Sequence, residues 1–233
     1  MTRASTLLFG LILVSASTGL AGPAFAAGSS PIVIELFTSQ GCSSCPPANA
    51  NLITLSQRPN VLVLSFAVTY WDRLGWKDSF GKQEFTDRQV VYEPGLQQHG
   101  PYTPQMVVNG RATVVGNRLE EVENLLANAD PLRGPALDLG TAMLSVGAGT
   151  APASGADVWR VTYDPSVVEV PIGRGENSGR TLPHTHVVHD LQNLGTWTGT
   201  NLDLPIEPAA QGLRTAILVQ VKNGGPILSA TTN

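Results

Sequence analysis

The sequence predicts an α/β domain followed by a mostly antiparallel β domain, built as a sheet or a sandwich. In the first half, apolar runs typical of buried strands alternate with segments of helical periodicity, a pattern typical of βαβ units. After residue 133, short alternating runs separated by Gly, Pro, Asn and Asp replace the helical pattern, which favours antiparallel strands. We therefore place a domain boundary near residue 134, between residues 28–133 and 134–233.

Residues 1–27 have the pattern of a secretory signal peptide. Arg3 supplies a positive charge, LLFGLILVSA is a short apolar run, and AFAAG offers small residues for cleavage. The apolar run is too short to span a bilayer comfortably. We expect a periplasmic or secreted protein that has no membrane association after cleavage and whose cysteines meet oxidising conditions.

Composition narrows the possible partners. The chain has 14 Lys and Arg against 18 Asp and Glu, a net charge of −4, and no basic run. Nucleic-acid binding needs concentrated positive charge, so we expect no nucleic-acid partner. Hydrophobic residues make up 42% of the 233 residues, which is enough for a packed core.

The first half is predicted in more detail. Strands are expected at 31–37 and 61–68, a helix at 46–57 between them, and a helix ending near residue 92 and capped by Asp78 or Ser79.

Two further elements are expected before residue 134. The Asn109-Gly110 turn predicts a hairpin of strands at 103–110 and 111–116. A helix should follow, with Asn117 and Glu120 forming a pair that resembles a capping box.

Both cysteines of the chain, Cys42 and Cys45, lie between the first strand and the first helix. At a helix start, backbone N–H groups and the helix dipole favour the thiolate and lower the thiol pKa below its free value of about 8.5. Cys42 is then the attacking sulfur in disulfide exchange, and Cys45 resolves the mixed disulfide. The C-x-x-C spacing therefore predicts a redox-active pair that needs no further cofactor.

Two other interpretations of the pair stay open. A metal site would need about four ligands, and the candidates beyond the cysteines are His184, His186 and His189. On a regular strand His184 and His186 share a face while His189 points to the other, which is poor geometry for three ligands. A purely structural disulfide is the other alternative, although a loop this short constrains the unfolded chain only weakly.

Pro104 and Glu35 are further candidate site residues. If the Thr103–Pro104 bond is cis, its backbone lies against the disulfide and pairs with an extended substrate; an ordinary trans proline at a strand edge is the alternative. Glu35 stands in an otherwise apolar strand. One interpretation is that Glu35 accepts a proton from the resolving cysteine. The other is that it points to an edge or pairs with an arginine, and both interpretations stay open.

Two loops complete the set of candidates. Tyr70, Trp71 and Trp76 follow the second strand and either form a ligand wall or, as we favour, pack the loop onto the body of the protein. The polar segment RGENSGR (174–180) precedes the histidines and is predicted to be a loop whose charged residues pair with a partner or face solvent.

Several motifs together resemble a known family. VIELFTSQGCSSCPPAN, YWDRLGWKD, YTPQMVVNG and GENSGRTLPHTHVVHDLQNLGTW are similar to secreted bacterial thioredoxin-like proteins whose function is not established. The resemblance covers most of the mature chain. It implies a thioredoxin-like domain over 28–133, Pro104 in the cis-proline position and, by analogy, a redox role.

The sequence also departs from thioredoxin around the cysteines. Gly41 stands where thioredoxin has a tryptophan, a Ser-Ser pair separates the cysteines, and Pro46 and Pro47 follow them. Because proline is well tolerated only in the first helical turn, either the helix starts near Pro46 or its first turn is distorted. A start near Pro46 leaves Cys42 in the loop, where the helix dipole lowers its pKa less.

The functional expectation is an exported thiol–disulfide oxidoreductase acting on protein or small-molecule thiols and disulfides. The alternative is a non-catalytic binding module with a thioredoxin-like scaffold and a permanent disulfide. A metal chaperone that uses the dithiol is a third hypothesis. The sequence does not fix the substrate, the direction of exchange, the role of the β domain or the oligomeric state.

Overall fold

The computed structural model describes Met1 and residues 30–233, so the predicted signal peptide at 1–27 lies outside the described residues apart from its first one. The helices are α1 (Pro46–Leu55), α2 (Gln83–Tyr92) and α3 (Leu119–Ala127), with a short 3-10 helix η1 (Asp72–Leu74). Within residues 30–233 no helix is both long enough and apolar enough to cross a bilayer. The strands are β1 (Ile32–Thr38), β2 (Val61–Ala67), β3 (Gln105–Val108), β4 (Ala112–Val115), β5 (Leu137–Leu139), β6 (Met143–Val146), β7 (Ala156–Pro171), β8 (Thr181–Trp197), β9 (Leu202–Pro205), β10 (Arg214–Val221) and β11 (Ile227–Thr232).

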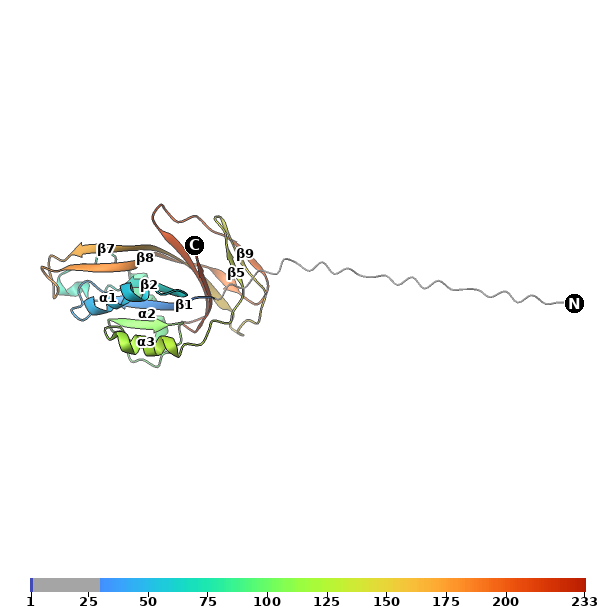
Figure 1. The fold of residues 1–233 in the computed structure, drawn as a ribbon, viewed down its shortest axis with the longest axis horizontal. Coiled ribbons are helices and arrows are strands. Elements are labelled where there is room, and N and C mark those ends of the chain that lie inside the picture. The colour runs from blue at the N-terminus through green and yellow to red at the C-terminus, as the bar shows by residue number, and fades with distance from the viewer. Residues whose placement is uncertain (2–29) are drawn as a thin grey trace.

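One eight-stranded sheet joins the two halves of the chain, in the order β11-β10-β7-β8-β2-β1-β3-β4. Figure 1 shows the long strands β7 and β8 from the second half beside β2 and β1 from the first. Only the β1–β2 and β2–β8 pairings are parallel; the others are antiparallel. The protein is therefore a mixed α/β structure dominated by a large, mostly antiparallel sheet. The thioredoxin-like arrangement of residues 28–133 and the division near residue 134 stay predictions.

Helices cover both faces of the first half of this sheet. Alternation along β1 turns Ile34 and Leu36 toward α1 and α3, while Val33 and Phe37 face α2 and share a core with β7, β10 and β11. A second sheet, in the order β5-β6-β9, packs on the other face of β7 and β10 around the buried Trp197. The runs after residue 133 thus form antiparallel strands in two packed layers.

The Asn109-Gly110 turn joins β3 and β4 as the sequence predicts. Both residues have positive φ, 52° and 62°, the conformation that a type I′ hairpin turn requires. At Gly110 a Cβ atom would lie 2.8 Å from the carbonyl oxygen of Gly225, so only glycine fits this close approach.

Two predicted helix caps are wrong. Helix α3 begins after Arg118, and no side chain caps it, so Asn117 and Glu120 form no capping box. Helix α2 begins at Gln83 rather than near Asp78 or Ser79. Asp78 instead accepts hydrogen bonds from the backbone N–H groups of Gln40 and Phe80, so its carboxylate holds two loops together and is not available to a helix.

Candidate functional site: a covered disulfide

The Cys42–Cys45 disulfide lies in the turn that leads from β1 into α1. The two sulfurs are bonded, and their Cα atoms are 5.4 Å apart. Helix α1 begins at Pro46 with Cys45 as its N-cap residue, so the prolines occupy the first turn, where a missing N–H costs nothing. Of the two arrangements that the sequence left open, the structure has the helix start near Pro46, with Cys42 outside the helix.

Both cysteines are fully covered, with 0% of either residue exposed. The cover includes the loop between β7 and β8, which the sequence shows only as the polar segment 174–180. The side-chain amide of Asn177 donates to the carbonyl oxygens of Gln40 and Cys42, at 2.9 Å each. The backbone N–H of Ser43 donates to Glu176 Oε2 at 3.2 Å. We call residues 173–180 the cover loop.

The cover loop itself rests on an aromatic side chain. Cβ atoms at Gly173 and Gly175 would lie 3.1 and 3.4 Å from Trp76, so the loop backbone passes close to this indole. Trp76 in turn donates from Nε1 to Gln40 Oε1 at 2.9 Å. The hydrogen bond to Gln40 holds the aromatic loop at Trp76 against the body of the protein, as the interpretation that we favour predicts for this residue. The same indole supports the cover loop.

Pro104 lies immediately before β3, and the Thr103–Pro104 peptide bond is cis. Trp71 donates from Nε1 to Thr103 Oγ1 at 2.8 Å, and its Cβ lies 3.2 Å from the position that a Cβ on Gly41 would take. Trp71 thus connects the cysteine turn with the cis-proline segment. An open cavity of about 510 Å³ borders Tyr70, Trp71 and Thr103.

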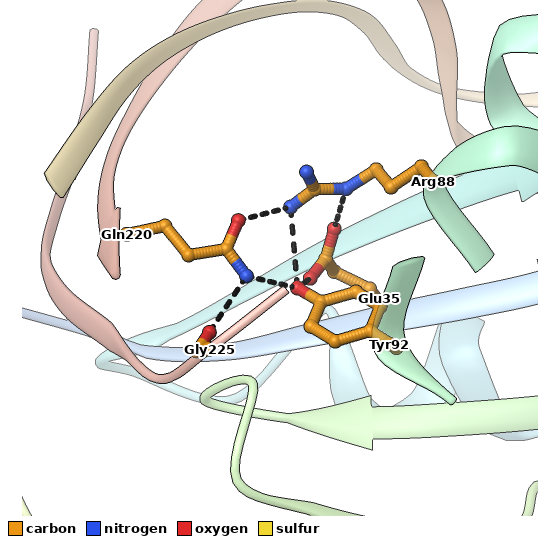
Figure 2. A network of polar contacts seen from close by, with 5 residues as sticks. All are labelled: Glu35, Arg88, Tyr92, Gln220 and Gly225. Carbon is orange, nitrogen blue, oxygen red and sulfur yellow. Dashed lines mark hydrogen bonds and ion pairs between the residues drawn. The ribbon is translucent and has the colours of Figure 1, made fainter. Parts of the chain in front are cut away.

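Glu35 lies in a buried ionic network on the α2 side of the sheet (Figure 2). Arg88 donates from Nε to Glu35 Oε1 at 2.6 Å, and Tyr92 donates its hydroxyl hydrogen to Glu35 Oε2. The Tyr92 oxygen accepts from Arg88 Nη2 at 3.2 Å and from Gln220 Nε2 at 2.9 Å. Burial raises the pKa of Tyr92 well above its ordinary value, so Tyr92 is a neutral donor to the carboxylate. The arginine-paired interpretation of Glu35 is the one the structure has.

The three histidines do not follow the alternation expected for a strand. His186 has a φ of 49°, and the β7–β8 register shifts between Asp164 and Val167. His184 and His189 both lie edge-on against Phe80, while His186 stacks on Tyr163. The prediction that His184 and His186 share a face opposite to His189 is therefore wrong, because the irregular backbone at His186 changes the order of the faces.

His184 is the most buried of the three. Its Nδ1 is 3.3 Å from the side-chain amide of Asn49 on α1, and burial lowers its pKa from 6.5 to about 4. Burial also lowers the pKa of His186 to about 4. Among residues 30–233 no group of three or more His, Cys, Asp and Glu side chains is arranged to hold a metal ion.

Sequence reasoning missed Asn177 and Arg88 as partners of the candidate residues. The polar, glycine-rich composition of 174–180 marked a loop, but nothing in the sequence indicated that it reaches residues more than 130 positions away. Arg88 carried no signal beyond its charge, because α2 lacks a clear apolar stripe around it.

Comparison with known proteins gives a family match and structural neighbours. The family model described as a protein of unknown function (DUF1223) matches residues 33–221. A crystal structure of a protein from Agrobacterium tumefaciens is similar, with 31% identity and a TM-score of 0.71 over 89% of this chain and 95% of that one. HBP35 of Porphyromonas gingivalis has a similar fold, with 11% identity and a TM-score of 0.59 over 88% of this chain and 75% of that one. No curated protein matches.

Proposed function

The chain belongs to the DUF1223 family of proteins of unknown function, and we propose that it is an exported thiol–disulfide oxidoreductase with a thioredoxin-like first half. The observation that carries this proposal is the placement of the bonded pair Cys42–Cys45 between the carboxyl end of β1 and the start of α1. The cis peptide bond before Pro104 is a second feature in its favour.

In the proposed exchange, the Cys42 thiolate attacks one sulfur of a substrate disulfide and expels the other as a thiolate, which takes up a proton. Cys45 then attacks the Cys42 sulfur and releases the second substrate thiol. Two electrons pass to the substrate, and the Cys42–Cys45 disulfide forms. The same steps in reverse oxidise a substrate dithiol. We assign Glu35 no step, because its two oxygens already hold Arg88 and Tyr92.

Exchange at this site requires the cover loop to move, because neither cysteine is exposed. The loop's side-chain hold on the cysteine turn consists of the hydrogen bonds from Asn177 and to Glu176. Each such bond contributes about 0.5–1.5 kcal/mol to stability, so local opening is accessible without unfolding of the sheet. The polar character of this hold supports a site that opens over a permanently sealed one.

The alternative is a non-catalytic binding module whose disulfide is permanent. Its specific support is the same burial of both sulfurs, since a disulfide without access to thiols stays intact. The two proposals differ in whether the folded protein exchanges.

The test compares the rate at which dithiothreitol reduces the pair in the wild type, in Asn177→Ala and in Asn201→Ala, an exposed control ahead of β9. Reduced cysteines are trapped by alkylation and counted by mass spectrometry. We expect Asn177→Ala to be reduced about tenfold faster, because it opens the cover loop, and the control to match the wild type. Reduction that occurs only as fast as global unfolding, in all three proteins, would establish the permanent disulfide.

A further inference from the structure

A second cavity lies on the α2 face of the sheet, where the ionic network of Glu35 ends. It measures about 450 Å³ and lies between α2 and the strands β7, β8 and β10. Volumes of this size are typical of small-molecule sites, and such sites combine apolar walls with a few polar groups. The residues that matter here are Asp87, Arg88, Asp157, Trp159, Leu191 and Val221.

The strand register explains why an acidic and an aromatic side chain meet in this cavity. Asp157 on β7 is paired with Gln220 on β10, so both side chains lie on the face that holds the network. Val158 points to the opposite core, which places Trp159 back on the Asp157 side. Trp159 is half-buried, and the guanidinium of Arg88 lies 5.5 Å from its ring.

Arg88 forms the buried end of the cavity, and within the described residues both N–H donors of its Nη1 atom are unused. Its side chain is 5% exposed, and its Nε and Nη2 atoms bind Glu35, Tyr92 and Gln220. Within residues 30–233, Nη1 makes no hydrogen bond, and in Figure 2 it points away from the other residues drawn. A guanidinium nitrogen with this placement is suited to a carboxylate.

The rim of the cavity has the opposite charge. Asp157 forms no salt bridge within the described part of the chain, whereas Glu84 is 3.4 Å from Lys82 and Asp87 accepts a hydrogen bond from Gln83. An anion alone would be repelled by these carboxylates, and a cation alone would leave Arg88 Nη1 unpaired. The arrangement fits a ligand with both charges.

We infer that this cavity binds a zwitterionic dipeptide with apolar side chains. Its carboxylate is held by Arg88 Nη1, its ammonium group lies near Asp157 and Asp87, and its apolar part packs on Trp159, Leu191 and Val221. The inference does not depend on the redox proposal, because no cysteine borders this cavity.

The experiment measures the affinity of the full-length protein for leucyl-leucine by isothermal titration calorimetry. Two matched probes each lack one charge: leucyl-leucinamide has no carboxylate, and N-acetyl-leucyl-leucine has no ammonium group. We expect saturable binding of leucyl-leucine and about tenfold or greater loss for each probe, since each loses a charged hydrogen bond.

Two variants locate the site. Asp157→Asn keeps the side-chain shape and removes the charge that the ammonium group needs, so we expect about tenfold weaker binding. Trp159→Leu, checked for folding by circular dichroism, should also weaken binding through loss of the aromatic wall. Asp203→Asn, on β9 and outside the cavity, is the matched control and should bind as the wild type does.

Three results would overturn the inference: no binding of leucyl-leucine up to about 10 mM, equal affinity for all three probes, or undiminished affinity in both cavity variants. Because Cys42→Ser, Cys45→Ser protein should bind leucyl-leucine normally, a failure of the redox proposal leaves this outcome unchanged.

Discussion

The carboxyl end and the middle of β1 are secured in different ways. Beyond its carboxyl end, the disulfide is covered by a loop that bonds mainly to backbone groups, with exposed residues on both sides of Asn177. In its middle, Glu35 is held by Arg88 and Tyr92, which are themselves buried. Opening of the cover loop would break only hydrogen bonds to backbone groups and would leave no buried charge unpaired. Separating Glu35 from Arg88 would leave a buried charge without its partner. The contacts of the cover loop are therefore compatible with local opening, whereas breaking the ionic network requires the surrounding core to unfold.

The largest expected effect is at the ionic network. Arg88→Met leaves the fully buried Glu35 without its counter-charge and should lower the free energy of unfolding by about 3–5 kcal/mol. Urea unfolding followed by circular dichroism measures it. The Glu35→Leu, Arg88→Met double variant should be more stable than the single variant, because no isolated charge remains. A single variant as stable as the wild type would contradict the comparison.

His184 should make the stability of the protein depend on pH. Burial lowers its pKa from 6.5 to about 4, so the folded state disfavours the proton. The contribution is fully present above pH 6.5, falls as the pH drops toward 4 because the unfolded state protonates first, and amounts to a loss on the order of 3 kcal/mol.

Unfolding free energies measured between pH 4 and 7.5 test this dependence. His184→Gln should flatten the curve, with a remaining slope from His186, whose pKa is also about 4. His99→Gln, at an exposed site, is the control and should keep the full slope. Equal slopes in both variants would show that His184 is not the group responsible.

Removing the disulfide should cost less than breaking the ionic network. The Cys42→Ser, Cys45→Ser double variant releases a loop with a sequence separation of only 3, and the chain-entropy model gives about 2 kcal/mol or less. Thermal unfolding of the oxidised wild type and the double variant measures the difference. A loss larger than that of Arg88→Met would mean that the disulfide, and not the network, secures β1.

The smallest effect is expected at Glu176. Its side chain accepts one hydrogen bond from an exposed backbone N–H, so Glu176→Ala should change the free energy of unfolding by less than about 1 kcal/mol. It should nevertheless increase the rate of disulfide reduction, since it removes one of the contacts of the cover loop. Chemical denaturation and thiol trapping on the same samples separate the two effects; unchanged reduction would assign the cover to Asn177 alone.

Local pattern was sufficient for most of the elements. The strands around residues 31–37 and 61–68, helix α1 and the Asn109-Gly110 hairpin follow from apolar periodicity and turn chemistry that a few neighbouring residues determine. The helix caps failed because a long-range demand outweighed a local preference: Asp78 bonds to Gln40 and not to a helix end.

The candidate site was predictable only in part, for a similar reason. The C-x-x-C pair and Thr103-Pro104 are visible in the sequence, because their chemistry is local. The cover by Asn177 and the pairing of Glu35 with Arg88 depend on how distant strands meet, and no short-range signal encodes that. The histidine geometry failed because a single left-handed residue, His186, reverses the alternation that a regular strand would have.

The junction between β2 and β8 has a consequence for any shortened form of this protein. β8 borders β2 on the side away from β1, with Ser65 opposite Val187. A fragment ending at residue 133 would leave the nearly uninterrupted apolar strand VLVLSFA with a row of bare backbone donors and acceptors. Such an edge recruits strands from other chains, so the fragment should aggregate even where its own core is intact.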